Sequence, residues 1–115
     1  MTTILIVDDE YLIADILGYA MEDEGYMVVK ASNGRRGLEV LDRERPELVI
    51  TDFMMPVMDG LEFARAIRAK AGLADLPIIL MSGAQGSVGR ASPELFAAVF
   101  DLSLIHISEP TRLLS

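Results

Sequence analysis

The sequence predicts an α/β fold built on a parallel sheet, and two observations support this prediction. Short apolar runs of strand length alternate with segments whose apolar residues recur at the period of a helix. The runs are apolar throughout and do not alternate with polar residues, which is typical of parallel strands covered on both faces. Strands that alternate with helices at such short intervals favour right-handed crossovers and hence a parallel sheet.

The first strand, helix and second strand follow each other closely. Ile4–Val7 is the first apolar run, and the helical period then extends over Glu10–Glu24. Gly25 is expected just after the last turn of this helix, where a left-handed backbone suits glycine. The apolar stripe of the helix is expected to contain Leu12, Ile13, Ile16, Leu17, Ala20 and Met21. Met27–Val29 is the second strand, and Ser32–Gly34 is a turn.

The same pattern continues through the middle of the chain. A second amphipathic helix is centred on Gly37–Leu41 and stops before Pro46, which cannot continue it. Leu48–Thr51 is the third strand, Leu61–Ala71 the third helix and Leu76–Met81 the fourth strand. In the third helix the residues at helical spacing are Leu61, Ala64, Ile67 and Arg68.

After Ala84 the pattern is less regular. Residues 85–90 are rich in glycine. Ser92 and Pro93 form a favourable helix start, because serine is a good N-cap residue and proline suits the first helical position. The segment from Leu95 is therefore expected to begin as helix, and to end as a fifth strand around Ala98–Phe100.

Composition limits the classes of protein that this chain can represent. Its 115 residues suffice for one domain with a single core, and 51% of them are hydrophobic. A formal net charge of −8 disfavours nucleic-acid binding by this domain alone. Without cysteine the chain has no disulfide or thiolate metal site. It shows no signal-peptide pattern and no apolar run near the roughly 20 residues of a membrane span. A cytoplasmic domain is expected, and its oligomeric state is left open.

Polar residues end several of the predicted strands. Asp8 and Asp9 follow the first strand, Asp52 ends the third, and Ser82 follows the fourth. Ligands of parallel α/β sheets bind outside the carboxyl ends of the strands, where these residues are expected. Several carboxylates at one place are costly unless a cation or a phosphoryl group binds there. Asp8 and Asp9 could instead favour the start of the following helix through its dipole.

In order and spacing these residues resemble the receiver domain of two-component response regulators. The resemblance rests on Asp8-Asp9, Asp52, the loop Met55-Pro56-x-Met58-Asp59-Gly60 and the turn Ser82-Gly83-Ala84, and it covers residues 3 to about 101. It implies a flavodoxin-like three-layer sandwich whose five parallel strands are ordered 2-1-3-4-5. It also implies that Asp52 accepts a phosphoryl group from a sensor histidine kinase or a phosphotransfer protein.

The residue types suit this chemistry. A carboxylate can attack phosphorus and form a mixed anhydride, and Mg²⁺ needs only a few carboxylates because it keeps several waters. Asp9 and Asp52 are the expected side-chain ligands of Mg²⁺, with Asp8 close by through water. By resemblance, the backbone carbonyl of Met54 is a further ligand. Ser82 is expected to donate its hydroxyl to the phosphoryl group and so draw the following loop inward.

Two positions are expected to set the lifetime of the phosphorylated state. In the family, the residues two after the acceptor and two after the serine affect attack by water, and here these are Met54 and Ala84. Neither side chain can orient a water, so slow self-dephosphorylation is expected. Enzymes that use an aspartate as phosphoryl nucleophile usually have a second acid at the Met54 position. A binding module is therefore favoured over a Mg²⁺-dependent phosphatase.

The chain departs from the family at its C-terminal end. Leu102 and Ser103 stand where receivers normally carry Lys-Pro, and the aromatic switch position falls on Val99, beside Phe100. Pro110 interrupts the final helix, which is expected to be incomplete. Residues 102–115 resemble the translation of sequencing-adaptor DNA, so the receiver domain is expected to span residues 1–101. The missing lysine leaves an alternative, a phosphorylation-independent interaction domain or an inactive fragment.

Overall fold

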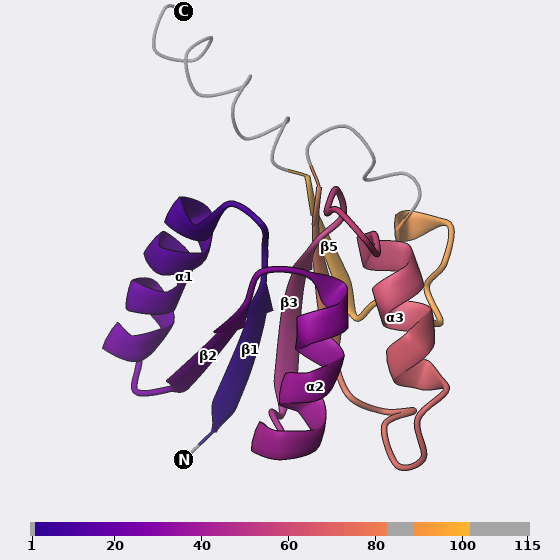
Figure 1. The fold of residues 1–115 in the computed structure, drawn as a ribbon, viewed down its shortest axis with the longest axis horizontal. Coiled ribbons are helices and arrows are strands. Elements are labelled where there is room, and N and C mark those ends of the chain that lie inside the picture. The colour runs from indigo at the N-terminus through magenta and orange to yellow at the C-terminus, as the bar shows by residue number, and fades with distance from the viewer. Residues whose placement is uncertain (1, 83–88, 102–115) are drawn as a thin grey trace, which may run out of the picture.

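Five parallel strands form one sheet in the order β2-β1-β3-β4-β5 in the computed structural model, which describes residues 2–82 and 89–101 (Figure 1). The strands are β1 (Thr3–Val7), β2 (Met27–Ala31), β3 (Leu48–Asp52), β4 (Ile78–Ser82) and β5 (Ala98–Asp101). The helices with assigned bounds are α1 (Tyr11–Asp23), α2 (Gly34–Glu44) and α3 (Gly60–Arg68). This architecture confirms the predicted α/β fold and its 2-1-3-4-5 strand order.

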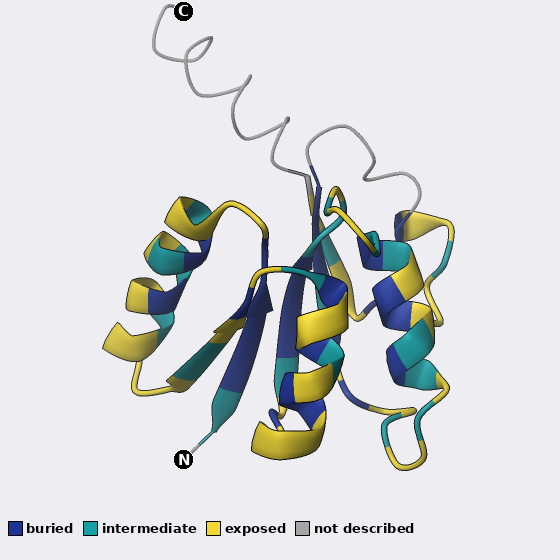
Figure 2. Ribbon diagram, in the orientation of Figure 1, coloured by how far each residue is buried: buried dark blue, intermediate teal, exposed yellow. Residues whose placement is uncertain are grey.

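Helices cover both faces of the sheet, which makes the fold a three-layer sandwich (Figure 1). On β1, Leu5 and Val7 belong to the core under α2 and α3, together with Phe63. Ile4 and Ile6 point to the other face and pack in the core under α1. The central strands are therefore buried on both sides, as their continuous apolar runs predicted (Figure 2).

Local hydrogen bonds explain where two of the helices begin. The side chain of Asn33 accepts a hydrogen bond from the N–H of Arg36 at 2.9 Å and so caps α2. Asp59 and Glu62 form a reciprocal capping box at the start of α3, with distances of 2.8 and 3.0 Å. At the end of α1, Gly25 has φ +95°, the left-handed conformation expected for it.

The apolar stripe predicted for α1 is wrong in part. Leu12 and Ile16 are 66% and 60% exposed, whereas Ala14 and Gly18 are the buried residues of the helix. A Cβ at Gly18 would lie 2.9 Å from Cε of Lys30 on β2, so a larger residue there would displace the lysine side chain where the helix meets the sheet. The closest contact therefore uses small residues, to which a hydrophobicity pattern gives little weight.

The helix predicted from Ser92 is also wrong, because the chain there forms a turn. The N–H of Leu95 donates to the carbonyl of Ser92 at 3.0 Å, and the N–H of Ala97 already donates to Ile78 on β4 at 2.8 Å. Too few residues separate these two bonds for a helix to form. The predictions that concern Ala84, Leu102 and residues 103–115 lie outside the described residues.

Candidate functional site

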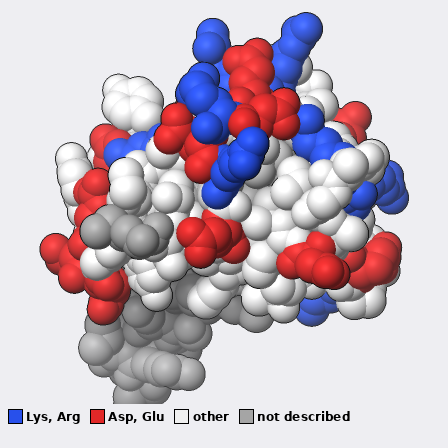
Figure 3. Space-filling view, turned by 90° about the horizontal axis from the view of Figure 1, so that it is seen from below, with Lys and Arg blue, Asp and Glu red and all other residues white. Residues whose placement is uncertain are grey.

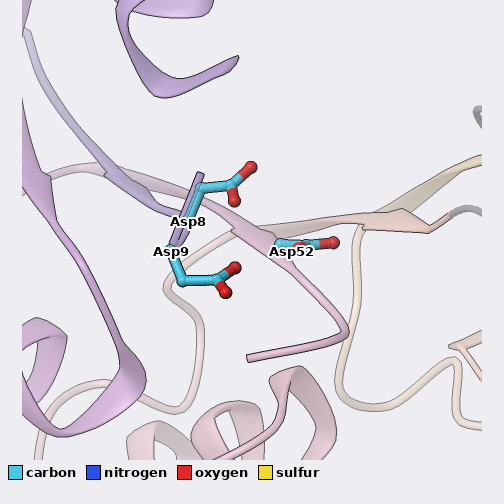
Figure 4. Close-up of side chains that lie close together, drawn as sticks. All are labelled: Asp8, Asp9 and Asp52. Atoms are coloured by element: carbon cyan, nitrogen blue, oxygen red, sulfur yellow. The ribbon is translucent and has the colours of Figure 1, made fainter. Parts of the chain in front are cut away.

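Three aspartates meet at the carboxyl ends of β1 and β3. Asp8 and Asp9 follow β1 directly, and Asp52 is the last residue of β3. These two strands are neighbours, with Val7 opposite Thr51, so the residues that follow emerge side by side. One carboxylate oxygen from each aspartate lies within 4.8 Å of the others (Figure 4).

Asp8 is the most deeply buried of the three carboxylates, with 3% of its surface exposed. Its Oδ1 accepts a hydrogen bond from the N–H of Glu10 at 2.9 Å, and its own N–H donates to the carbonyl of Ala31 on β2 at 3.1 Å. The pKa of Asp8 is raised to about 6, mainly by burial and further by the nearby charges of Asp52 and Asp9, against the opposing hydrogen bond from the Glu10 N–H. An added cation would relieve this repulsion.

Asp52 is half-buried, and the loop after it holds its carboxylate. Its Oδ1 accepts a hydrogen bond from the N–H of Phe53 at 2.8 Å. Burial is the main cause that raises the pKa of Asp52, and the charge of Asp9 acts in the same direction. The backbone N–H groups of Phe53 and Met54 oppose this shift, so they stabilise the ionised carboxylate.

The loop between β3 and α3 packs closely against Asp52 at Gly60. The N–H of Gly60 donates to the carbonyl of Phe53 at 2.8 Å. A Cβ at Gly60 would lie only 2.5 Å from the backbone oxygen of Asp52, so no other residue allows this approach. Within the loop, Val57 has φ +74°, a conformation that is strained for a β-branched residue. The sequence pattern predicts a loop here but not its close contact with Asp52.

Ser82 lies at the same edge of the sheet. It ends β4 and is fully buried, and the preceding Met81 pairs with Asp52 across the β3–β4 ladder. Ser82 therefore stands one residue beyond the partner of Asp52 in the ladder. The four predicted side chains, Asp8, Asp9, Asp52 and Ser82, thus share one end of the sheet.

The donor set fits a hard divalent cation. The three carboxylates, with ligand atoms within 4.8 Å of one another, offer only oxygen atoms, which Mg²⁺ prefers. The pKa values of Asp8 and Asp52 are raised mainly by burial and further by the neighbouring negative charges, which a cation would offset. The lysines of the sequence are Lys30 and Lys70, and neither pairs with these aspartates. Lys30 Nζ lies 2.8 Å from Asp15, and Lys70 Nζ lies 3.1 Å from Asp42.

A groove beside Asp8 was not predicted from the sequence. It has a volume of about 590 Å³ and is lined by Asp8 and by residues of α1, of the end of β2 and of α2, among them Tyr11, Lys30 and Arg36. These residues come from separate elements, so no spacing in the sequence could have revealed it.

On the face at the other end of the strands, acidic and basic side chains are interleaved (Figure 3).

Comparison with known proteins decides the family. The family model described as the response regulator receiver domain matches residues 4–98. This chain belongs to that family. Receiver domains are signalling modules of two-component systems, bind Mg²⁺ in an acidic pocket, and interact with sensor histidine kinases or phosphotransfer proteins. In this receiver domain, no described helix combines the length and the apolar character of a membrane span.

Solved structures show the same fold. The N-terminal domain of a response regulator receiver protein from Methanoculleus marisnigri JR1 is 25% identical, with a TM-score of 0.80 over 95% of this chain and 98% of that chain. The response regulator protein TrrA from Thermotoga maritima, in complex with Mg²⁺-BeF, is 33% identical with a TM-score of 0.77, covering 88% and 86% of the two chains. The receiver domain of a histidine kinase from Syntrophus aciditrophicus is 29% identical with a TM-score of 0.79, covering 99% and 90%.

Proposed function

We propose that this receiver domain is switched by phosphorylation of Asp52, with a sensor histidine kinase or a phosphotransfer protein as the donor. The observation that carries the proposal is the convergence of three carboxylates within 4.8 Å, at the strand ends where ligands of such sheets bind. Asp8, Asp9, Asp52 and the backbone carbonyl of Met54 would hold Mg²⁺. The TrrA complex with Mg²⁺-BeF supports this assignment by similarity.

Asp52 acts as the nucleophile. A carboxylate oxygen forms a bond to phosphorus while the bond between phosphorus and the donor's imidazole nitrogen breaks, and the electron pair returns to that nitrogen. The Phe53 N–H, which donates to Asp52 Oδ1 at 2.8 Å, orients the carboxylate and keeps it ionised. When bound, Mg²⁺ supplies positive charge that offsets the repulsion between this carboxylate and the phosphoryl oxygens.

Ser82 responds to the new charge. Its hydroxyl lies at the end of β4, one residue beyond the partner of Asp52 in the ladder. Donation to a phosphoryl oxygen would pull the chain that follows β4 toward Asp52 and convert a local charge into a change of surface. We place this cytoplasmic domain at residues 1–101, with residues 102–115 outside it. The domain works as a binding module and not as a turnover enzyme.

Chemical phosphorylation tests the proposal. The full chain is incubated with acetyl phosphate and Mg²⁺, and its intact mass is measured. We expect the mass of one added phosphoryl group, which Asp52→Asn and removal of Mg²⁺ by EDTA both abolish. Asp42→Asn is the matched control, because Asp42 is an exposed aspartate on α2 that pairs with Lys70, away from the site.

The same measurement separates the competing functions. The sequence has no lysine beyond Lys70, so the cation that usually follows the fifth strand is missing. If the wild-type chain gains no phosphoryl group, the proposal fails and a phosphorylation-independent interaction domain takes its place. Steady hydrolysis of a small phosphomonoester would instead identify a phosphatase.

A further inference from the structure

The loop after Asp52 carries three methionines, and their sulfurs have different surroundings. Met55 and Met58 pack against the core under α2 and α3. The hydroxyl of Thr51 lies 3.9 Å from Sδ of Met55, and Sδ of Met58 would lie 3.0 Å from a Cβ at Gly34. Met54, in contrast, is 60% exposed. Among the loop methionines, Met54 is exposed, whereas Met55 and Met58 are partly buried.

Met54 is also held close to the proposed phosphoryl acceptor. Its backbone N–H hydrogen-bonds to the Asp52 carboxylate. The two ends of the loop are joined, because the N–H of Gly60 donates to the carbonyl of Phe53 at 2.8 Å. The Met54 side chain therefore starts from a backbone anchored at the reacting group. A change in its polarity would act on water that approaches Asp52.

We propose that Met54 is a site of reversible methionine oxidation and that its sulfoxide shortens the lifetime of phospho-Asp52. This inference rests on the proposed phosphorylation of Asp52. The oxidant class is a two-electron peroxide, represented by hydrogen peroxide. Oxidation replaces a thioether, which is a weak acceptor, with a sulfoxide oxygen, which is a strong one.

The oxidation step balances with peroxide alone. A sulfur lone pair attacks one peroxide oxygen, the S–O bond forms as the O–O bond breaks, and proton transfer releases water. Sulfur loses two electrons and the peroxide gains them. The sulfoxide oxygen then accepts a hydrogen bond from a water beside the acyl phosphate. That water attacks phosphorus as the bond between phosphorus and the Asp52 oxygen breaks, the electron pair of that bond restores the carboxylate, and inorganic phosphate leaves with the protons of the water.

Met27 provides a matched control for Met54. It is 50% exposed and lies on the edge strand β2, at the start of the strand and away from the carboxylates at its end. Met81 is only 5% exposed and is expected to resist oxidation. Peptide mass mapping of the peroxide-treated chain should therefore find sulfoxide at Met54 and Met27 before Met55, Met58 and Met81. If Met54 is not among the first sites, the inference is overturned.

The decay of the phosphorylated state gives the functional test. The chain is treated with peroxide or left untreated, phosphorylated with acetyl phosphate and Mg²⁺, and desalted, and the loss of the phosphoryl group is followed by intact mass. We expect about tenfold faster decay after oxidation, less than the roughly 10²–10⁴-fold of general acid–base catalysis, because the sulfoxide orients the water without taking its proton. Met27→Leu should keep this response. Met54→Leu should decay at the same rate with and without peroxide, and Met54→Gln should decay fast without it.

The outcomes separate this inference from the proposed function. If phosphorylated chain forms but decays equally before and after complete oxidation of Met54, the inference is wrong and the phosphorylation switch stands. If Met54→Leu still responds to peroxide, another residue is responsible and the inference is again wrong. If no phosphoryl group is gained by any form of the chain, both proposals fail together.

Discussion

At the scale of single residues, Asp8 is placed where its charge destabilises the folded chain. Its pKa rises from 3.8 to about 6 on folding, mainly through burial, so the folded chain binds more protons than the unfolded chain between these pH values. The stability that Asp8 contributes is therefore present below its unfolded pKa and lost as pH rises through its folded pKa. The pKa of Asp52 is raised too, so the stability that Asp52 contributes is likewise lost as pH rises.

Replacing Asp8 with asparagine should remove the loss of stability that ionisation of Asp8 causes at higher pH. Asparagine keeps an oxygen that can accept the hydrogen bond from the Glu10 N–H. In EDTA near pH 7.5 we expect Asp8→Asn to raise the free energy of unfolding by about 1–2 kcal/mol, and near pH 4 to leave it almost unchanged. Urea denaturation at both pH values measures this. A stability gain that is equal at both pH values would contradict the electrostatic explanation.

The sequence was informative about which residues meet here but not about how deeply each is buried. Asp8, Asp9 and Asp52 could be predicted to converge because each follows an apolar run, and parallel strands end at one edge. The near-complete burial of Asp8 and the 2.5 Å approach of a Cβ at Gly60 to Asp52 depend on how the loops pack. Such distances have no periodic signal in a sequence.

At the scale of elements, Arg68 fastens the end of α3 to the segments before β4 and β5. One guanidinium nitrogen donates to the carbonyls of Leu73 and Leu76, at 3.0 and 2.6 Å, and the other donates to Leu95 at 2.8 Å. The planar guanidinium can reach several carbonyls at once, which a lysine cannot. These bonds join segments that are far apart in the sequence.

Loss of Arg68 should therefore lower the stability of the whole domain. Arg68→Met keeps much of the apolar stem but leaves three partly buried carbonyls without this donor. We expect a loss of about 2–4 kcal/mol in the free energy of unfolding, measured with urea. Arg65→Met is the control, because Arg65 lies exposed on the same helix and should change stability little. Equal effects of the two substitutions would show that the hydrogen bonds of Arg68 contribute little to stability.

The same contacts explain why one predicted element was wrong while most were right. The helix starts at Asn33 and Asp59 follow from capping groups within a few residues, so local sequence was sufficient. The helix expected from Ser92 had equally good local signals. There Arg68, 27 positions before Leu95, takes the carbonyl of Leu95, and Ala97 pairs with β4. Long-range bonds override the local preference.

At the scale of the whole molecule, strand order turns separate acidic segments into one site. β1 and β3 are neighbours although β2 and two helices lie between them in the chain. Alternating strands and helices predict a parallel sheet, but periodicity alone does not give the order, which came from resemblance to receiver domains. Once β1 and β3 are adjacent, the aspartates after them must lie together. The domain then carries a concentrated negative charge at one end.

That concentration predicts a stability change that depends on the cation. A ligand that binds only the folded chain raises its free energy of unfolding, by about 2.7 kcal/mol at a hundredfold excess over its dissociation constant. We expect Mg²⁺ to raise the melting temperature more than Na⁺ does at equal ionic strength, because a divalent ion offsets more of the negative charge of Asp8, Asp9 and Asp52. Asp9→Asn and Asp52→Asn should lose this increase, whereas Asp42→Asn should keep it.

Protons should compete with the metal for the same oxygens. With the pKa of Asp8 at about 6, a drop in pH from about 7.5 to 5 protonates this carboxyl in the folded chain and reduces the charge that attracts a cation. The increase in melting temperature produced by Mg²⁺ should therefore shrink as pH falls, which thermal melts at several pH values can measure. An increase that is independent of pH, or that survives Asp52→Asn, would place the bound cation elsewhere on this acidic domain.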